Sequence, residues 1–83
     1  MKIEFLGVGE AFDPALGNTS LLIHTAEKLL IDCGYAIPLA YFAKNLEPNF
    51  LDAIYLTHSH ADHTFGLPAL LTRIYEEGRS KPL

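Results

Sequence analysis

The chain has 83 residues, of which 49% are hydrophobic, and its formal net charge at pH 7 is −4. This apolar content is enough to form a core, and acidic and basic residues are interspersed, so neither a disordered chain nor a basic nucleic-acid-binding face is indicated. The single cysteine excludes an internal disulfide, the first residues do not resemble a signal peptide, and no apolar run approaches the length of a membrane span. We therefore expect a cytoplasmic protein with no membrane segment.

Three strands are predicted in the first half of the sequence. Ile3 and Phe5 alternate with charged residues in the segment 2–7, which is typical of a strand with one buried face. Residues 8–18 contain Gly, Asp-Pro and Gly-Asn, and these residue types favour a loop. Apolar runs on either side of the turn sequence TAEK indicate a hairpin over residues 19–32.

The second half of the sequence predicts a helix, a strand and another helix. Residues 37–46 place apolar side chains on one helical face, namely Leu39, Phe42, Ala43 and Leu46. Residues 52–58 are almost continuously apolar, which favours a strand buried on both faces. The segment 66–77 repeats the helical spacing and is followed by Gly78, a natural helix end; its apolar positions are Leu67, Leu70, Leu71 and Ile74. An antiparallel start followed by a strand–helix–strand unit predicts an α/β fold in which helices cover a sheet.

A dense group of metal-ligand residue types follows the fourth predicted strand. Three of the four histidines lie there together with one aspartate, as His58, His60, Asp62 and His63. Side chains two apart on a strand point the same way, so His58 and His60 can bind one metal ion at the distance of roughly 2.0–2.1 Å that zinc requires. Asp62 and His63 follow as the chain turns toward the helix, which suits a second metal beside the first. The alternative is a set of solvated loop histidines, but four ligand-type residues facing one way are far rarer than a lone histidine.

The sequence THSHADH resembles the HxHxDH signature of the metallo-β-lactamase superfamily, and GNTSLLI and LLIDCG stand where members carry their second and third strands. The resemblance implies an αββα sandwich of which residues 1–83 are the N-terminal part, with the remainder of the single domain absent from this chain. It implies that His58 and His60 bind the first of two divalent metal ions and that Asp62 and His63 bind the second. We expect zinc, with manganese or iron as the alternatives. Asp32 would hydrogen-bond and orient a ligand histidine, the alternative being a cap at the end of a strand.

The residues flanking the motif, HADHTFGLPALL and MKIEFLGVGEAF, are similar to those of ribonuclease Z and related phosphodiesterases. This resemblance implies a metal-dependent hydrolase of a small-molecule or RNA phosphodiester, in which a metal-bridging hydroxide attacks phosphorus and Asp62 is also catalytic because it orients that hydroxide. Two alternatives stay open, a hydrolase of thioesters, esters or lactams and a non-catalytic metal-binding fragment. The family site needs further ligands from later strands, so we expect residues 1–83 alone to be inactive and to pair with the missing part or with a copy of themselves.

Two other side chains give weaker indications. His24 ends a predicted strand beside a turn, which favours a surface histidine over a metal ligand. Cys33 has no partner motif of the kind that activates a nucleophilic thiol, so we expect a small buried residue.

Overall fold

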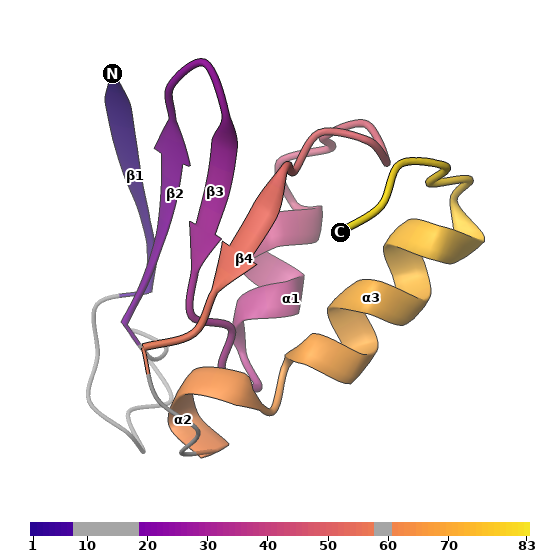
Figure 1. Cartoon of the computed structure of the whole chain (residues 1–83). Coiled ribbons are helices and arrows are strands. Elements are labelled where there is room, and N and C mark those ends of the chain that lie inside the picture. Colours follow the sequence, from indigo (N-terminus) through magenta and orange to yellow (C-terminus); the bar gives the residue numbers. More distant parts are fainter. Residues whose placement is uncertain (8–18, 58–60) are drawn as a thin grey trace.

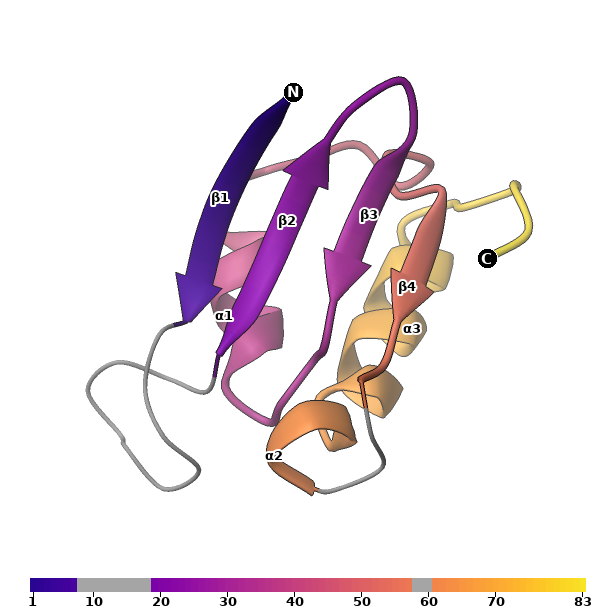
Figure 2. The ribbon, with the colours of Figure 1, turned by 60° about the vertical axis from the view of Figure 1, so that its left-hand side comes forward.

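The structure is a computed structural model, and it describes residues 1–7, 19–57 and 61–83, with the backbone alone at Ala61 and Asp62. Four strands form one sheet in the described residues, and α1 and α3 lie on one side of it (Figures 1 and 2). The strands are β1 (Lys2–Gly7), β2 (Ser20–His24), β3 (Lys28–Ile31) and β4 (Ala53–Tyr55). The helices are α1 (Ile37–Phe42), α2 (Ala61–Thr64) and α3 (Leu67–Glu76).

The sheet has the topology that the sequence predicts. Its strand order is β1-β2-β3-β4, with antiparallel pairing from β1 to β3 and parallel pairing of β3 with β4. A tight turn joins β2 to β3, where the Thr25 hydroxyl donates to the carbonyl of Glu27 at 2.7 Å. Helix α1 forms the crossover between the two parallel strands. The α/β class and the hairpin are therefore confirmed, and the carboxyl ends of β3 and β4 meet at one edge of the sheet.

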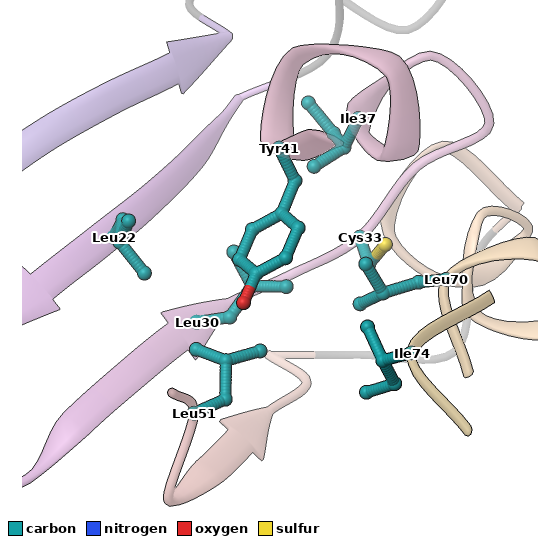
Figure 3. Packing of buried hydrophobic residues seen from close by; sticks show 8 residues of the cluster. All are labelled: Leu22, Leu30, Cys33, Ile37, Tyr41, Leu51, Leu70 and Ile74. Carbon is teal, nitrogen blue, oxygen red and sulfur yellow. The ribbon is translucent and has the colours of Figure 1, made fainter. Parts of the chain in front are cut away.

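One face of the sheet packs against the helices and forms the core. Register places Leu22, Leu30 and Ile54 side by side on neighbouring strands, and the first two are completely buried. Among the described residues the core contains eight buried apolar side chains, namely Leu22, Leu30, Cys33, Ile37, Tyr41, Leu51, Leu70 and Ile74. Figure 3 shows the Tyr41 ring pointing from α1 toward Leu30 and Leu51. Burial of one such leucine stabilises the fold by about 1.5–3 kcal/mol, so this layer holds the helices to the sheet.

The opposite face of the sheet is apolar on every strand. The residues that point to it are Ile3, Phe5, Leu21, Ile23, Leu29, Ile31, Ala53 and Tyr55. The prediction that Ile3 and Phe5 form the buried face of their strand is wrong here, because these side chains are 46% and 67% exposed. The strand itself is confirmed, but its pleat turns Glu4 and Leu6 toward the helices instead.

Two elements differ from their predicted bounds and burial. Helix α1 ends at Phe42 rather than at residue 46, and Leu39 on its predicted apolar face is 77% exposed. The buried face carries Ile37 and Tyr41, which lie one turn apart and point at the sheet. Strand β4 is also shorter than predicted and is not buried on both faces, because Tyr55 is 64% exposed.

Helix α3 agrees with its prediction closely. Leu70 and Ile74 are buried, and the other two predicted apolar residues, Leu67 and Leu71, are partly buried against the core. Gly78 has a φ of 106°, a left-handed conformation that glycine adopts without steric cost. The N–H groups of Gly78 and Arg79 donate to the carbonyls of Tyr75 and Ile74, which is the hydrogen-bond pattern of a Schellman motif. No helix in the described ranges is long and apolar enough to cross a membrane.

The buried Arg79 fixes the segment that leads into β4. Its guanidinium donates to the carbonyls of Pro48 at 3.0 Å and Leu51 at 2.8 Å, and also to those of Lys81 and Pro82 at 2.8 and 2.9 Å. A buried guanidinium needs many acceptors, and carbonyl oxygens from two segments supply them here. The end of the chain is thereby tied to the loop before β4.

Candidate metal centre

The structure describes only part of the predicted metal-binding set. His58 and His60 lie outside the described residues, and so does the side chain of Asp62, whose backbone belongs to α2. His63 is described, and the structure brings it into contact with Asp32. Within residues 1–7, 19–57 and 61–83 no group of three or more potential ligand side chains is found, and three of the four predicted ligands do not enter that comparison.

Asp32 occupies a special backbone position directly after β3. Its φ is 61°, in the left-handed region that aspartate tolerates better than most residues. Its N–H donates to the carbonyl of Tyr55 at 2.8 Å, and its carbonyl accepts the Ser20 hydroxyl at 2.8 Å. The residue is 4% exposed. The positive φ of Asp32 turns the chain out of the sheet at the carboxyl end of β3. The Asp32 side chain then contacts Thr57, two residues after the end of β4.

The Asp32 carboxylate accepts three hydrogen bonds from the described part of the chain. Oδ1 accepts the backbone N–H of Thr57 at 2.8 Å, and Oδ2 accepts the Thr57 hydroxyl at 2.7 Å. Oδ2 is also 2.8 Å from Nδ1 of His63. Burial raises the pKa of Asp32, but the hydrogen bonds from Thr57 and His63 outweigh it and hold the pKa below its usual value. The group is therefore an anion at neutral pH, and because a carboxylate only accepts, His63 carries its proton on Nδ1.

His63 is held by its backbone as well as by its ring. Its carbonyl accepts the N–H of Cys33 at 2.7 Å, and the carbonyl of Cys33 accepts the N–H of Gly66 at 2.9 Å. The two segments approach so closely that a Cβ at Gly66 would lie 2.1 Å from the carbonyl oxygen of Gly34. Asp32 thus fixes the ring of His63, and the next residue, Cys33, fixes its main chain.

The contact between Asp32 and His63 fits a metal site. Histidines that bind metal ions almost always donate their other ring N–H to a carboxylate, a carbonyl or water, which fixes the tautomer and the ring orientation. With Nδ1 engaged by Asp32, Nε2 is the nitrogen that a metal ion would use. The contact is the one that the predicted role of Asp32 requires, while metal binding by His63 stays a prediction. Cys33 is completely buried, as expected, and burial raises the pKa of its thiol to about 12, so the thiol is protonated at neutral pH.

His24 lies away from this site, at the other end of β2. Its Nε2 is 2.6 Å from a carboxylate oxygen of Glu4, and its ring packs edge-on against Phe50 with the centroids 5.7 Å apart. The side chain is 19% exposed, so it is less open to solvent than the sequence suggested. Among the described residues it contacts Glu4 and Phe50, and that it binds no metal stays a prediction.

Thr57 and Gly66 contribute to the site but were not predicted to. Thr57 stands directly before His58 in the sequence, yet its hydroxyl binds a carboxylate 25 residues earlier in the chain. Gly66 allows the close approach of the loop after α2 to the loop after β3. Both roles arise from tertiary contacts, so the only sequence indication was their position beside the motif and at the start of a predicted helix.

Comparison with known proteins identifies the family. The whole chain, residues 1–83, matches the protein family described as Anti-Pycsar protein Apyc1. The chain belongs to this family. A ribonuclease Z of Pediococcus pentosaceus is 36% identical over an alignment that covers 100% of this chain and 29% of that protein. An Apyc1 protein of Saccharibacillus brassicae is 41% identical over 81% of this chain and 28% of its own length.

Solved structures agree with these sequence relationships. The short form of human tRNase Z matches this Apyc1-family chain with a TM-score of 0.79 and 36% identity, over 89% of this chain and 29% of that one. The metallo-β-lactamase fold protein YhfI of Bacillus subtilis matches with a TM-score of 0.69 and 26% identity, over 84% and 29%. The chain therefore has the fold of the N-terminal portion of a metallo-β-lactamase domain, and it spans less than a third of each of these relatives.

Proposed function

We propose that residues 1–83 belong to a metal-dependent hydrolase that cleaves phosphodiester bonds in RNA or in a small molecule. The observation that carries this proposal is the 2.8 Å contact between the buried Asp32 carboxylate and His63 at the carboxyl end of the parallel strand pair. That end of a sheet is where α/β proteins assemble their ligand sites. The names of two relatives, ribonuclease Z and tRNase Z, refer to RNA as the substrate and support the choice of bond.

The predicted ligand set divides between two metal ions, with His58 and His60 on the first and Asp62 and His63 on the second. Asp32 keeps the proton of His63 on Nδ1, so the lone pair of Nε2 would face the metal ion. The negative charge of Asp32 also makes the imidazole a stronger electron-pair donor to that ion. Zinc is the metal we expect, and when bound it would supply Lewis acidity and make hydroxide available near neutral pH. Asp62 would orient the attacking oxygen by accepting its hydrogen bond. Histidine and carboxylate donors suit such an ion.

The second part of the proposal concerns the apolar sheet face. Eight apolar side chains point to the side of the sheet that α1 and α3 do not cover, and Phe5 and Tyr55 among them are more than half exposed. A face of this composition is stable only when another layer packs against it. Because the matched relatives are more than three times as long as the chain, we propose that the rest of the same domain forms this layer and supplies the remaining metal ligands.

Metal analysis of the complete protein that contains this chain tests the proposal. We expect His58→Ala together with His60→Ala to lower the bound metal and to abolish turnover of bis(p-nitrophenyl) phosphate. His24→Gln is the matched control, because His24 contacts Glu4 and Phe50 rather than the motif, and it should retain both properties.

The other outcomes separate the alternatives. Equal metal content in the double variant and the wild type would contradict the metal centre itself. Turnover of thioester or lactam substrates without phosphodiester turnover would favour another hydrolase of the superfamily. Bound metal without turnover of any of these substrates would favour a non-catalytic metal-binding protein.

A further inference from the structure

The segment that carries the remaining predicted ligands is bounded on both sides by residues that bind Asp32. Thr57 precedes His58, and His63 follows Asp62. Both flanking residues hydrogen-bond to the same buried carboxylate. We propose that Thr57 is a positioning residue of the metal centre, whose hydroxyl holds the Asp32 carboxylate in the orientation that also binds His63. This inference rests on the proposed function, because it assumes that His63 binds metal.

The geometry of the Thr57 contacts explains why the hydroxyl matters. The backbone N–H of Thr57 binds Oδ1 at 2.8 Å, and its hydroxyl binds Oδ2 at 2.7 Å. A single hydrogen bond leaves a carboxylate free to rotate about its last side-chain bond, whereas donors on both oxygens fix its plane. Oδ2 is also the oxygen that faces Nδ1 of His63 at 2.8 Å. The hydroxyl thus sets the direction in which Asp32 presents its acceptor to the histidine.

The same contacts close a loop. The Asp32 carboxylate joins Thr57, at the start of the motif, to His63, at its end. Metal affinity depends on how well ligands are held before the ion arrives, so a loosened start of the motif should weaken binding.

Packing does not explain the choice of threonine at this position. Thr57 is among the exposed residues, so its methyl group contributes little to the core. Valine has nearly the same shape and strand preference but lacks the hydroxyl, and serine keeps the hydroxyl but lacks the methyl group. The two substitutions therefore separate the hydrogen bond from the shape of the side chain.

The test compares Thr57→Val and Thr57→Ser in the complete protein, with Asp32→Ala as the reference for loss of the carboxylate. Zinc affinity is measured by competition with a chromogenic chelator. We expect Thr57→Val to weaken zinc binding by about 3–10-fold, less than the roughly 10–100-fold that follows loss of a direct partner of a ligand. Thr57→Ser should stay within about twofold of the wild type, since it keeps the hydrogen bond to charge.

A second readout does not involve metal or turnover. Nitrogen chemical shifts of His63 in the metal-free protein report which ring nitrogen carries the proton. We expect the Nδ1–H form in the wild type and in Thr57→Ser, and a mixture of both forms in Thr57→Val. Thr57→Ala repeats the comparison if the valine variant does not fold.

Unchanged zinc affinity together with an unchanged His63 tautomer in Thr57→Val would overturn the proposal, and so would a serine variant that behaves like valine. Absence of phosphodiester turnover alone would count against the proposed function but not against this role of Thr57. A protein that binds no zinc at all would refute the metal centre, and the tautomer measurement would then decide whether Thr57 orients Asp32.

Discussion

Replacing Gly66 by alanine should disturb the fold and the candidate metal centre together. Gly66 has a φ of −82° and a ψ of −13°, which alanine adopts without strain, so any cost comes from contacts. The new Cβ would lie 2.1 Å from the carbonyl oxygen of Gly34, 2.8 Å from Cδ of Pro38 and 3.0 Å from Sγ of Cys33. Two of these neighbours, Gly34 and Cys33, belong to the loop after β3, and that loop holds His63 through Asp32 and Cys33.

The size of the effect follows from these distances. The loop after α2 and the loop after β3 must separate by about 0.9 Å before the shortest contact reaches 3.0 Å, below which real Cβ contacts essentially never fall. Overpacking of this kind costs about 1–3 kcal/mol. The same movement stretches the 2.9 Å hydrogen bond from Gly66 to Cys33, and a lost hydrogen bond adds about 0.5–1.5 kcal/mol. We therefore expect Gly66→Ala to lower the free energy of unfolding by about 2–4 kcal/mol.

Urea denaturation of the complete protein, followed by far-UV circular dichroism, measures the loss. Zinc affinity is measured on the same samples and should fall, because His63 moves with the loop. Gly78→Ala is the matched control: it places alanine at a φ of 106° in open space, so it should cost about 1–2 kcal/mol of stability and leave zinc affinity unchanged. A Gly66→Ala protein as stable as the wild type, or one that loses stability but binds zinc normally, would refute this reasoning.

Two further predictions concern the surface. The hydrogen bond from Lys44 lowers the pKa of Glu4 to about 2, although burial opposes the shift and a hydrogen bond from His24 adds to it. The stabilising contribution of Glu4 is therefore fully present above its usual pKa of 4.5 and is lost as the pH falls toward 2. Glu4→Gln should therefore be less stable than the wild type at neutral pH, with the difference shrinking between pH 4.5 and 2 in urea titrations; parallel curves would contradict this assignment. Residues 1–83 alone should associate through the apolar sheet face, and Phe5→Thr with Tyr55→Thr should reduce the associated mass in light scattering. Leu39→Ser, which removes an exposed leucine from α1, should not reduce it, and a monomeric wild type would count against the uncovered face.

Local patterns in the sequence predicted the parts of the fold that depend on local forces. The spacing of leucines in residues 67–74, with Gly78 after them, predicts a helix with one apolar face and a left-handed end, and α3 has both. The turn between β2 and β3 follows from the short polar stretch between two apolar runs. In each case the decisive contacts lie within a few residues of one another.

The sequence patterns predicted the wrong buried face where a strand or helix carries apolar residues on more than one side. Both faces of the sheet can bury apolar side chains, so the alternation in residues 2–7 fixed a strand but not which face the helices would cover. In α1 the choice between the Leu39 side and the Tyr41 side depends on where the sheet lies, and the spacing of apolar residues did not contain that information. Tertiary packing decided both cases.

In the candidate site, too, the sequence predicts the features that depend on neighbouring residues and misses those that depend on distant segments. The ligand residues stand close together in the sequence, where their spacing makes a metal site recognisable, but the groups that orient them come from elsewhere. Asp32 reaches the motif only because β3 and β4 are parallel neighbours, and their register pairs Ile31 with Tyr55, so that the next residues on each strand meet. The left-handed turn at Asp32 then brings its carboxylate to Thr57 and His63 rather than to the solvent. The precision of the site therefore depends on strand register, and changes that shift β3 against β4 should weaken metal binding even though they alter no ligand.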